Sequence, residues 1–241
     1  MKITNFYSPN FDKKKRLLKS IKILVIHYTG MQSERESIDR LCDLKSKVSS
    51  HFIINRKGKI YRLVKDNQIA WHAGKSFWDK YNNINKNSIG IELVNKGHKL
   101  GYTNFSKKQI LSLVKICKHL IKKYKIKKKY IVGHSDIAPL RKIDPGEKFP
   151  WKKLAEKNIG IWHTNKSDFL KKLRKIKITK YEDKIKFIQN LKKIGYGFPK
   201  NSKFIFNKTL ESLQRRFRKE LINGLLDKEC LIIAQNLSKK L

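Results

Sequence analysis

Short apolar runs in the first part of the chain predict β-strands. Residues 21–26, with the sequence IKILVI, are almost continuously apolar and rich in β-branched side chains, which indicates a buried central strand. Residues 51–55 and 60–64 form two further runs, and Gly58 between them can supply the positive φ of a hairpin loop. We therefore expect a buried strand followed by an antiparallel pair.

Further along the chain, strand and helix periods alternate. Residues 88–94 alternate between apolar and polar side chains, which places Glu92 on one face of a strand. Residues 110–124 carry apolar side chains at helical spacing, behind a capping box that begins at Ser106. The short apolar run 130–132 predicts another strand. This mixture predicts an α/β (α+β) fold with a mixed central sheet flanked by helices.

After Trp162 the pattern becomes weak and then purely helical. Residues 163–181 are polar and basic, which indicates a linker or a loosely packed helix. Three amphipathic stripes follow: Ile185, Ile188, Leu191 and Ile194; Leu210, Leu213, Phe217 and Leu221; and Leu231, Ala234 and Leu237. We expect an N-terminal domain in 1–162, a linker in 163–181 and a small three-helix C-terminal domain in 182–241.

The chain is strongly basic. It has 58 Lys and Arg against 19 Asp and Glu, a formal net charge of +39 at pH 7. Such a charge attracts any polyanion, whether nucleic acid, an anionic membrane surface or cell-wall polymer. The lysines are spread along the whole chain together with many Ile and Asn residues, as compositional bias would also produce. Charge alone therefore does not choose a partner.

Cysteine usage and hydropathy bear on the compartment. Cys42, Cys117 and Cys230 lie far apart and form no CxxC pair, so neither a disulfide framework nor a thiolate zinc site is indicated. The N-terminal sequence MKITNFYSPNFDKKKRLLKS contains no apolar core of a signal peptide, and no segment has the apolar length that spans a bilayer. We expect a cytoplasmic monomer without a transmembrane segment.

Three side chains could form a hydrolytic metal site. Such a site needs three histidine or carboxylate ligands and a fourth position open for water. His27 and His134 each end an apolar strand, and Asp144 follows His134 by ten residues in a loop that contains proline and glycine. For either histidine alone, a backbone hydrogen bond at a strand end is the more common explanation.

Two charged side chains could complete this site. Glu92 interrupts an apolar strand, where a carboxylate is costly without a partner or a function. It could take a proton from water and pass it to a leaving nitrogen, or simply pair with one of the many lysines. Lys142 lies two residues before Asp144 and could stabilise an oxyanion, or be an ordinary exposed lysine.

Ordered motifs resemble a known enzyme family. They are VIHYTGM (25–31), VSSHFIINRKGKIYRLV (48–64), AWHAG (70–74), NSIGIELVN (87–95) and GHSDIAPLRKIDPGEKFPW (133–151). Their order and spacing, over about residues 5–162, resemble the type-2 N-acetylmuramoyl-L-alanine amidases. The resemblance implies Zn²⁺ ligated by His27, His134 and Asp144, with Glu92 as the catalytic glutamate and Lys142 as the lysine that stabilises the transition state. It also implies hydrolysis of the amide bond between N-acetylmuramic acid and L-alanine in peptidoglycan or muropeptides, in cell-wall turnover or recycling.

Two further regions belong to this resemblance. Trp71 and His72, in AWHAG, would contact sugar or peptide at the cleft edge, or else belong to a packed loop, whereas we expect a structural role for His51. DKIKFIQNLKKIGYGFP and TLESLQRRFR resemble a three-helix peptidoglycan-binding module, although a generic helical appendage would have the same periodicity. A wall-binding module favours the periplasm or the outer membrane, in conflict with the expected cytoplasmic location.

Two other classes of function remain as alternatives. A non-catalytic peptidoglycan-recognition protein would have the same fold without a competent site, and the retained candidate ligands and Glu92 argue against it. A nucleic-acid-binding protein would use the positive charge, but the chain has no helix-turn-helix, zinc-finger or RNA-recognition signature. The expected partner is peptidoglycan or a muropeptide, with no choice between intact wall and anhydro-muropeptide, and no specific nucleic acid.

Overall fold

A mixed β-sheet organises the N-terminal half of the protein. The structure is a computed structural model, which describes residues 2–198 and 202–241. Within these residues six strands pair in the order β1-β4-β3-β7-β2-β8. The strands are β1 (Ile3–Asn5), β2 (Ile23–Tyr28), β3 (Phe52–Ile54), β4 (Ile60–Arg62), β7 (Ser88–Leu93) and β8 (Ile131–Gly133). Only the hairpin of β3 and β4 is antiparallel, and a separate hairpin joins β5 (Phe77–Trp78) to β6 (Tyr81–Asn82).

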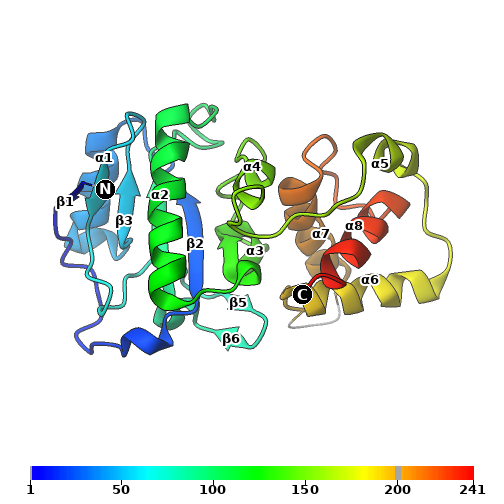
Figure 1. Cartoon of the computed structure of the whole chain (residues 1–241), viewed down its shortest axis with the longest axis horizontal. Coiled ribbons are helices and arrows are strands. Elements are labelled where there is room, and N and C mark those ends of the chain that lie inside the picture. The colour runs from blue at the N-terminus through cyan, green and yellow to red at the C-terminus, as the bar shows by residue number, and fades with distance from the viewer. Residues whose placement is uncertain (1, 199–201) are drawn as a thin grey trace.

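Helices lie over the sheet and beyond its β8 edge. They are α1 (Glu34–Cys42), α2 (Lys107–Tyr124), α3 (His134–Ile137), α4 (Trp151–Ala155), α5 (Ser167–Leu173), α6 (Tyr181–Ile194), α7 (Lys203–Phe217) and α8 (Lys228–Ser238). Short 3₁₀ turns occur at Leu18–Ser20, Leu44–Ser46, Ile84–Asn87 and Lys128–Tyr130. In Figure 1, α2 crosses the sheet, while α5 to α8 gather on the far side of α3 and α4. The predicted fold class is confirmed.

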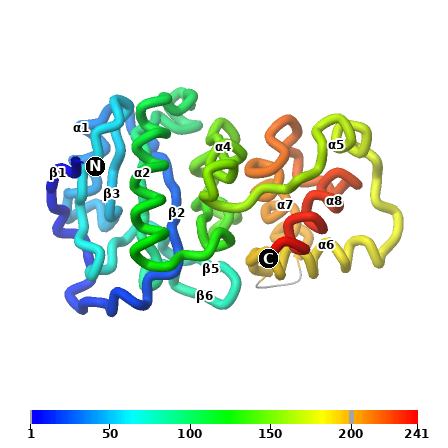
Figure 2. The backbone as a smooth tube through the Cα atoms, in the orientation of Figure 1, coloured from blue at the N-terminus to red at the C-terminus, as the bar shows by residue number. Residues whose placement is uncertain are grey.

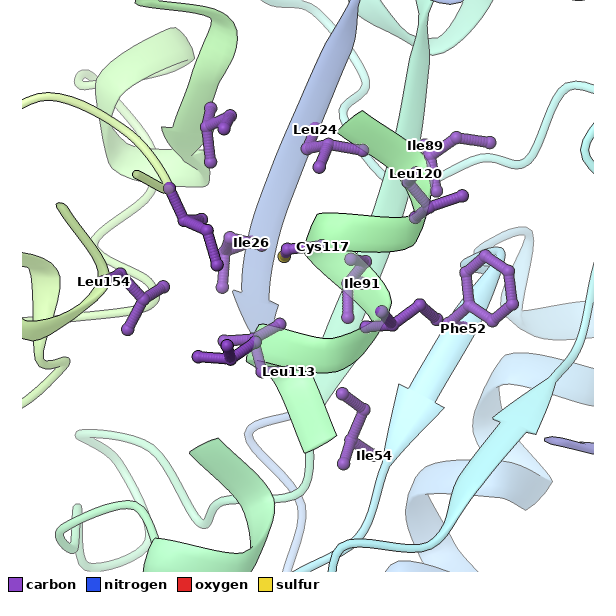
Figure 3. Packing of buried hydrophobic residues seen from close by; sticks show 14 of the residues in the cluster. Leu24, Ile26, Phe52, Ile54, Ile89, Ile91, Leu113, Cys117, Leu120 and Leu154 are labelled. Atoms are coloured by element: carbon purple, nitrogen blue, oxygen red, sulfur yellow. The ribbon is translucent and has the colours of Figure 1, made fainter. Parts of the chain in front are cut away.

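The first face of the sheet packs against α2. Ser106 caps this helix by accepting a hydrogen bond from the Gln109 amide at 3.1 Å, and Lys125 ends it in the left-handed conformation. The buried side chains of the helix meet the strand residues that point to this face. The residues of this cluster labelled in Figure 3 are Leu24, Ile26, Phe52, Ile54, Ile89, Ile91, Leu113, Cys117, Leu120 and Leu154. This first face is a continuous apolar layer.

The second face is covered by several elements. Ile23 and Val25 of β2 join an apolar cluster that includes residues of the C-terminal helices, whereas Ile53 of β3 joins another cluster with Leu41 of α1. Further along the same face of β2, the alternation of the strand places His27. The second face therefore carries apolar clusters on two sides and polar side chains at its carboxyl end.

The C-terminal helices confirm the third predicted apolar stripe, of Leu231, Ala234 and Leu237, confirm the second in outline and correct the first. In α6, Ile185 is 39% exposed while Phe187 is fully buried, so the inward stripe contains Phe187, Leu191 and Ile194. The helix is rotated from the predicted phase because the large ring of Phe187 packs inward in place of Ile185. The second stripe stops short of Leu221, since α7 ends at Phe217.

The segment between the two halves of the chain contains a helix. Figure 2 shows an extended stretch after α4 that leads to α5, which lies inside the predicted linker 163–181. Leu170 of α5 is buried in the same cluster as the C-terminal helices. Among the helices of the described residues, none has the length and apolar character needed to cross a bilayer.

Candidate metal centre and active-site pocket

The candidate site forms where three parallel strands end. In the parallel pairing of β2 with β7, His27 lies opposite Glu92. On the other side of β2, β8 runs directly into α3, whose first residue is His134. Because the carboxyl ends of parallel strands meet at one edge of a sheet, side chains distant in sequence come together there.

His27, His134 and Asp144 point one ligand atom each at a common centre. His27 Nδ1 lies 3.0 Å from His134 Nδ1 and 3.1 Å from Asp144 Oδ2, and His134 Nδ1 lies 3.2 Å from Asp144 Oδ2. All three residues are buried. Two imidazole nitrogens and one carboxylate oxygen thus direct three electron-pair donors at one centre. Two histidines and a carboxylate at this spacing fit the donor set of a tetrahedral zinc site, whose bonds are about 2.0–2.2 Å.

The charges of these groups suit a divalent cation. Burial, and next the neighbouring His134, lower the pKa of His27 to about 4, so its imidazole is neutral at pH 7. Burial alone would raise the pKa of Asp144, but its contacts with His134 and His27 hold it below the ordinary value. Neutral imidazole and ionised carboxylate are the forms that bind metal.

The loop that carries Asp144 is fixed at several points. The Ser135 amide donates to the Asp144 carbonyl oxygen at 2.8 Å, which ties the loop to α3. The Tyr102 hydroxyl donates to the Pro145 carbonyl oxygen at 2.6 Å. Gly146 follows with φ of +82°, a conformation that suits glycine. Pro145 and Gly146, which predicted a turn, therefore lie in a loop that hydrogen bonds hold in place.

Glu92 and Lys142 line the same pocket. Glu92 is partly buried, and its Oε2 atom is inaccessible and has no hydrogen-bond partner among the residues the structure describes. Burial, and next the charge of Asp144, raise the pKa of Glu92 to about 8. Within the described parts of the chain Glu92 forms no salt bridge, so the alternative of a lysine ion pair is not realised.

The pocket has a volume of about 450 Å³ and includes all seven predicted site residues. These are His27, Trp71, His72, Glu92, His134, Lys142 and Asp144. The same pocket is bordered by the basic residues Arg40, Lys96, Lys99 and Arg141. A concave site of this size, with convergent polar groups and a basic border, suits an anionic ligand.

A sequence profile described as N-acetylmuramoyl-L-alanine amidase matches residues 17–147, more than half of the chain. This chain belongs to the N-acetylmuramoyl-L-alanine amidase family. It is 35% identical over 233 residues to the N-acetylmuramoyl-L-alanine amidase AmiD of Escherichia coli K12, covering 91% of this chain and 83% of AmiD. The 1,6-anhydro-N-acetylmuramyl-L-alanine amidase AmpD of Haemophilus influenzae is 35% identical over 164 residues, covering 61% of this chain and 86% of AmpD.

Solved structures match the amidase along nearly its whole length. AmiD of E. coli, in complex with anhydro-N-acetylmuramic acid-L-Ala-D-γ-Glu-L-Lys, superposes with a TM-score of 0.80 and 33% identity over 95% of this chain and 92% of AmiD. AmpDh3 of Pseudomonas aeruginosa, in complex with anhydromuramic pentapeptide, has a TM-score of 0.80 and 29% identity over 98% of both chains. The likeness therefore includes the C-terminal helices as well as the amidase fold.

His72 of the amidase lies beneath the candidate metal ligands. Its Nδ1 is 3.1 Å from His27 Nε2, and its Nε2 is 3.1 Å from the Ser88 hydroxyl. The ring packs directly on Gly90, where an added Cβ would come within 2.5 Å of His72 Cγ. Both ring nitrogens are thus engaged with protein atoms, and the contact of His72 with substrate stays a prediction.

Trp71 and Arg141 brace the same wall of the pocket. The Trp71 indole nitrogen donates to Asp12 at 2.6 Å, which leaves the ring itself as the surface that could face a ligand. Arg141 donates to the carbonyl oxygens of Ala73 and Lys75, and so ties the AWHAG segment to the loop before Asp144. Arg141 was not among the site residues predicted from the sequence, although its place beside Lys142, between the GHSD and DPG segments, was a signal.

His51 has a structural place. Its Nδ1 accepts a hydrogen bond from the Gly90 amide at 3.1 Å, and its Nε2 lies 2.8 Å from Arg16 Nη2. The ring is fully buried behind His72. This arrangement agrees with the expected structural role and keeps His51 out of the ligand triangle.

Proposed function

We propose that this amidase uses zinc, held by His27, His134 and Asp144, to hydrolyse the amide bond between N-acetylmuramic acid and L-alanine in peptidoglycan or muropeptides. The observation that carries the proposal is the convergence of the three ligand atoms in a pocket that also contains Glu92. Membership of the amidase family supports the bond and the reaction. The donor set supports the metal.

The chemistry divides between the metal and the protein. Zinc, when bound, supplies a Lewis acid that lowers the pKa of water toward about 7 and polarises a carbonyl oxygen. Glu92 takes the proton from water as it attacks the lactyl carbonyl, and delivers that proton to the departing nitrogen of L-alanine. Its raised pKa makes its carboxylate a stronger base than an ordinary glutamate, and a cation nearby favours the ionised form.

Other side chains of the pocket have supporting roles. Lys142 stabilises the negative charge that develops on the carbonyl oxygen. His72 holds the His27 ring through its hydrogen bond to Nε2, the nitrogen that does not face the ligand triangle. The ring of Trp71 offers an apolar surface to sugar or peptide.

Two observations make muropeptides the proposed substrates: the ligands bound in similar solved structures and the positive charge at the border of the pocket. The two similar solved structures hold an anhydro-muramyl tripeptide and an anhydromuramic pentapeptide. Peptide carboxylates suit a pocket bordered by Arg40, Lys96 and Lys99. We therefore propose anhydro-muropeptides as accepted substrates, alongside intact peptidoglycan.

The test is release of free peptide from a purified anhydro-muropeptide, followed by mass spectrometry. We expect cleavage by the zinc-loaded full chain, loss of cleavage in excess chelator, and recovery when zinc is restored. His27→Ala should not recover with zinc, whereas a distant surface variant such as Lys219→Ala should behave as wild type. Full activity of the metal-free protein, or of His27→Ala, would contradict the proposal.

We also propose that residues 182–241 contribute binding to intact wall, as their resemblance to peptidoglycan-binding modules suggests. The full chain should co-sediment with purified peptidoglycan even when excess soluble muropeptide fills the pocket. Complete displacement by muropeptide would assign all wall binding to the pocket.

The proposed location of the protein is the cytoplasm. Cell fractionation distinguishes this location from the periplasm or the outer membrane.

A further inference from the structure

A buried carboxylate beside His134 is held by the C-terminal part of the chain. Asp136, two residues after His134, accepts a hydrogen bond from the Gly133 amide at 2.8 Å. Its other donors are Arg216 at 2.5 Å, Tyr196 at 2.8 Å and Ser212 at 3.4 Å. All three of these come from the helical region 182–241. The carboxylate that anchors the β8–α3 turn therefore depends on side chains from the other end of the sequence.

Arg216 contacts the segments on both sides of this turn, β8 before it and α3 after it. Besides its ion pair with Asp136 in α3, it donates to the carbonyl oxygen of Ile131, the first residue of β8, at 3.0 Å. Its guanidinium also stacks on the Trp151 ring, 4.1 Å from the ring centroid. One side chain of α7 thus fixes the strand before His134 and the helix that His134 begins.

The contact extends to other segments around the pocket. The Asp79 amide, in the hairpin that follows the AWHAG segment, donates to the Gly195 carbonyl oxygen at 2.7 Å. Gly195 has φ of +132°, and an added Cβ would come within 2.5 Å of the Trp78 ring. Next to Arg216, Arg215 Nε lies 4.0 Å from Glu147, three residues after Asp144. The C-terminal region therefore meets the site along several segments.

The ion pair between Asp136 and Arg216 is buried at both of its side chains. A carboxylate that loses its cationic partner while it stays buried keeps the full cost of its desolvation, so removal of the Arg216 cation from the folded protein is strongly unfavourable. The alignment with AmpD covers 86% of AmpD but 61% of this chain. Amidases of this family therefore occur without a counterpart of the whole C-terminal region, whereas in this chain that region supplies three donors to Asp136.

We propose that Arg216 and Tyr196 are positioning residues for the metal centre: through Asp136 they fix the turn that presents His134. The C-terminal region is then a built-in part of the catalytic centre, whatever wall binding it adds, rather than a freely tethered module. This inference rests on the proposed metal site.

The test compares two buried arginines of the full-length protein. Arg216→Met removes the cation next to Asp136, and Arg218→Met removes a similarly buried cation whose partners, Asp227 and Glu229, lie within the C-terminal region. The readouts are Zn²⁺ affinity, measured by competition with a chromogenic chelator, together with kcat, KM and the thermal unfolding midpoint. Both variants should lose thermal stability.

Only the Arg216 variant should change the metal centre. We expect Arg216→Met to weaken Zn²⁺ binding by about 10- to 100-fold and to lower kcat with little change in KM, as removal of a ligand-orienting partner does. Arg218→Met should keep wild-type Zn²⁺ affinity at temperatures where it is folded. Arg216→Lys, which retains a cation, should recover part of the loss. Equal weakening in the two methionine variants would overturn the inference, because the effect would then be general destabilisation.

Tyr196→Phe keeps the test decisive if Arg216→Met does not fold. It removes one donor to Asp136 without changing the packing of the ring against Trp78. We expect a Zn²⁺ affinity several-fold below wild type in a folded protein; wild-type affinity would overturn the inference. Failure of the wild-type chain itself to bind Zn²⁺ would instead overturn the metal centre of the proposed function.

Discussion

The two faces of the sheet differ in how they are covered. The first face is apolar throughout and is closed mainly by α2, a helix contributed by a single stretch of chain. The second face carries His27 and Glu92 and is covered by α1 near β3 and by the C-terminal helices near β2 and β8. A single covering helix would bury the carboxyl ends of β2 and β7. Because different elements cover the two sides of the second face, a pocket remains between their apolar clusters. The polar side chains in this pocket are still largely shielded from bulk water.

The difference also appears in what the buried groups do. On the first face burial removes apolar surface from water, and the contribution is nearly independent of direction. On the second face buried polar groups have partners at defined positions, as in the chain of contacts from His27 through His72 to Ser88, while Glu92 Oε2 has none among the described residues. Substitutions on the first face should therefore change stability, and those on the second should change activity first.

The largest expected effect is on the second face. Glu92→Gln keeps the shape of the side chain but removes the base, so kcat should fall by about 10²- to 10⁴-fold. Thermal unfolding should stay close to wild type, because Oε2 has no protein partner to lose among the described residues. The measurement is steady-state cleavage of muropeptide by the zinc-loaded enzyme. A variant with wild-type kcat would remove Glu92 from the chemistry.

Leu113→Ala tests the first face. Leu113 is fully buried between α2 and the sheet, so its truncation should lower the free energy of unfolding by about 2–5 kcal/mol. Below its unfolding transition the variant should cleave muropeptide at the wild-type rate. Urea unfolding and an activity assay on the same preparation check both parts. An activity loss as large as that of Glu92→Gln would break the distinction between the faces.

Gly90→Ala tests how tightly the second face is packed. The added Cβ would lie 2.5 Å from His72 Cγ, so the ring that supports His27 must move. We expect a loss of stability of about 1–3 kcal/mol together with a fall in kcat. In a His72→Ala background the same substitution should cost much less stability, since the obstructing ring is gone. Equal costs in both backgrounds would show that His72 is not the obstacle.

Asp66 provides the smallest and most pH-dependent test, away from the site. Burial raises the pKa of Asp66, but hydrogen bonds from Tyr124 and Lys123 and the charge of Arg62 outweigh it and lower the pKa below the ordinary value. Its stabilising contribution is therefore present above the unfolded-state pKa, about 3.9, and is lost as pH falls toward the folded-state pKa. The unfolding midpoint of Asp66→Asn should lie below wild type at pH 7, and the gap should shrink below about pH 4.

Much of the fold was predictable because its signals are local. The apolar run before His27, the hairpin around Gly58 and the helix behind Ser106 were each confirmed within a few residues. The phase of α6 was wrong, because Ile185 and Phe187 both fit a helical stripe and only packing chose the larger ring. Local period fixes the type of element, while neighbours decide which way it faces.

The sequence by itself determined the identities of the candidate ligands, of Glu92, and of the motifs that carry them. Only the tertiary structure brought His27, His134 and Asp144 within 3.2 Å of one another, because that proximity depends on strand order and register rather than on spacing along the chain. Only the tertiary structure, too, joined Asp136 to Arg216, 80 residues away. A salt bridge between distant residues leaves no periodic trace in the sequence, because only the packed fold brings the two charges together.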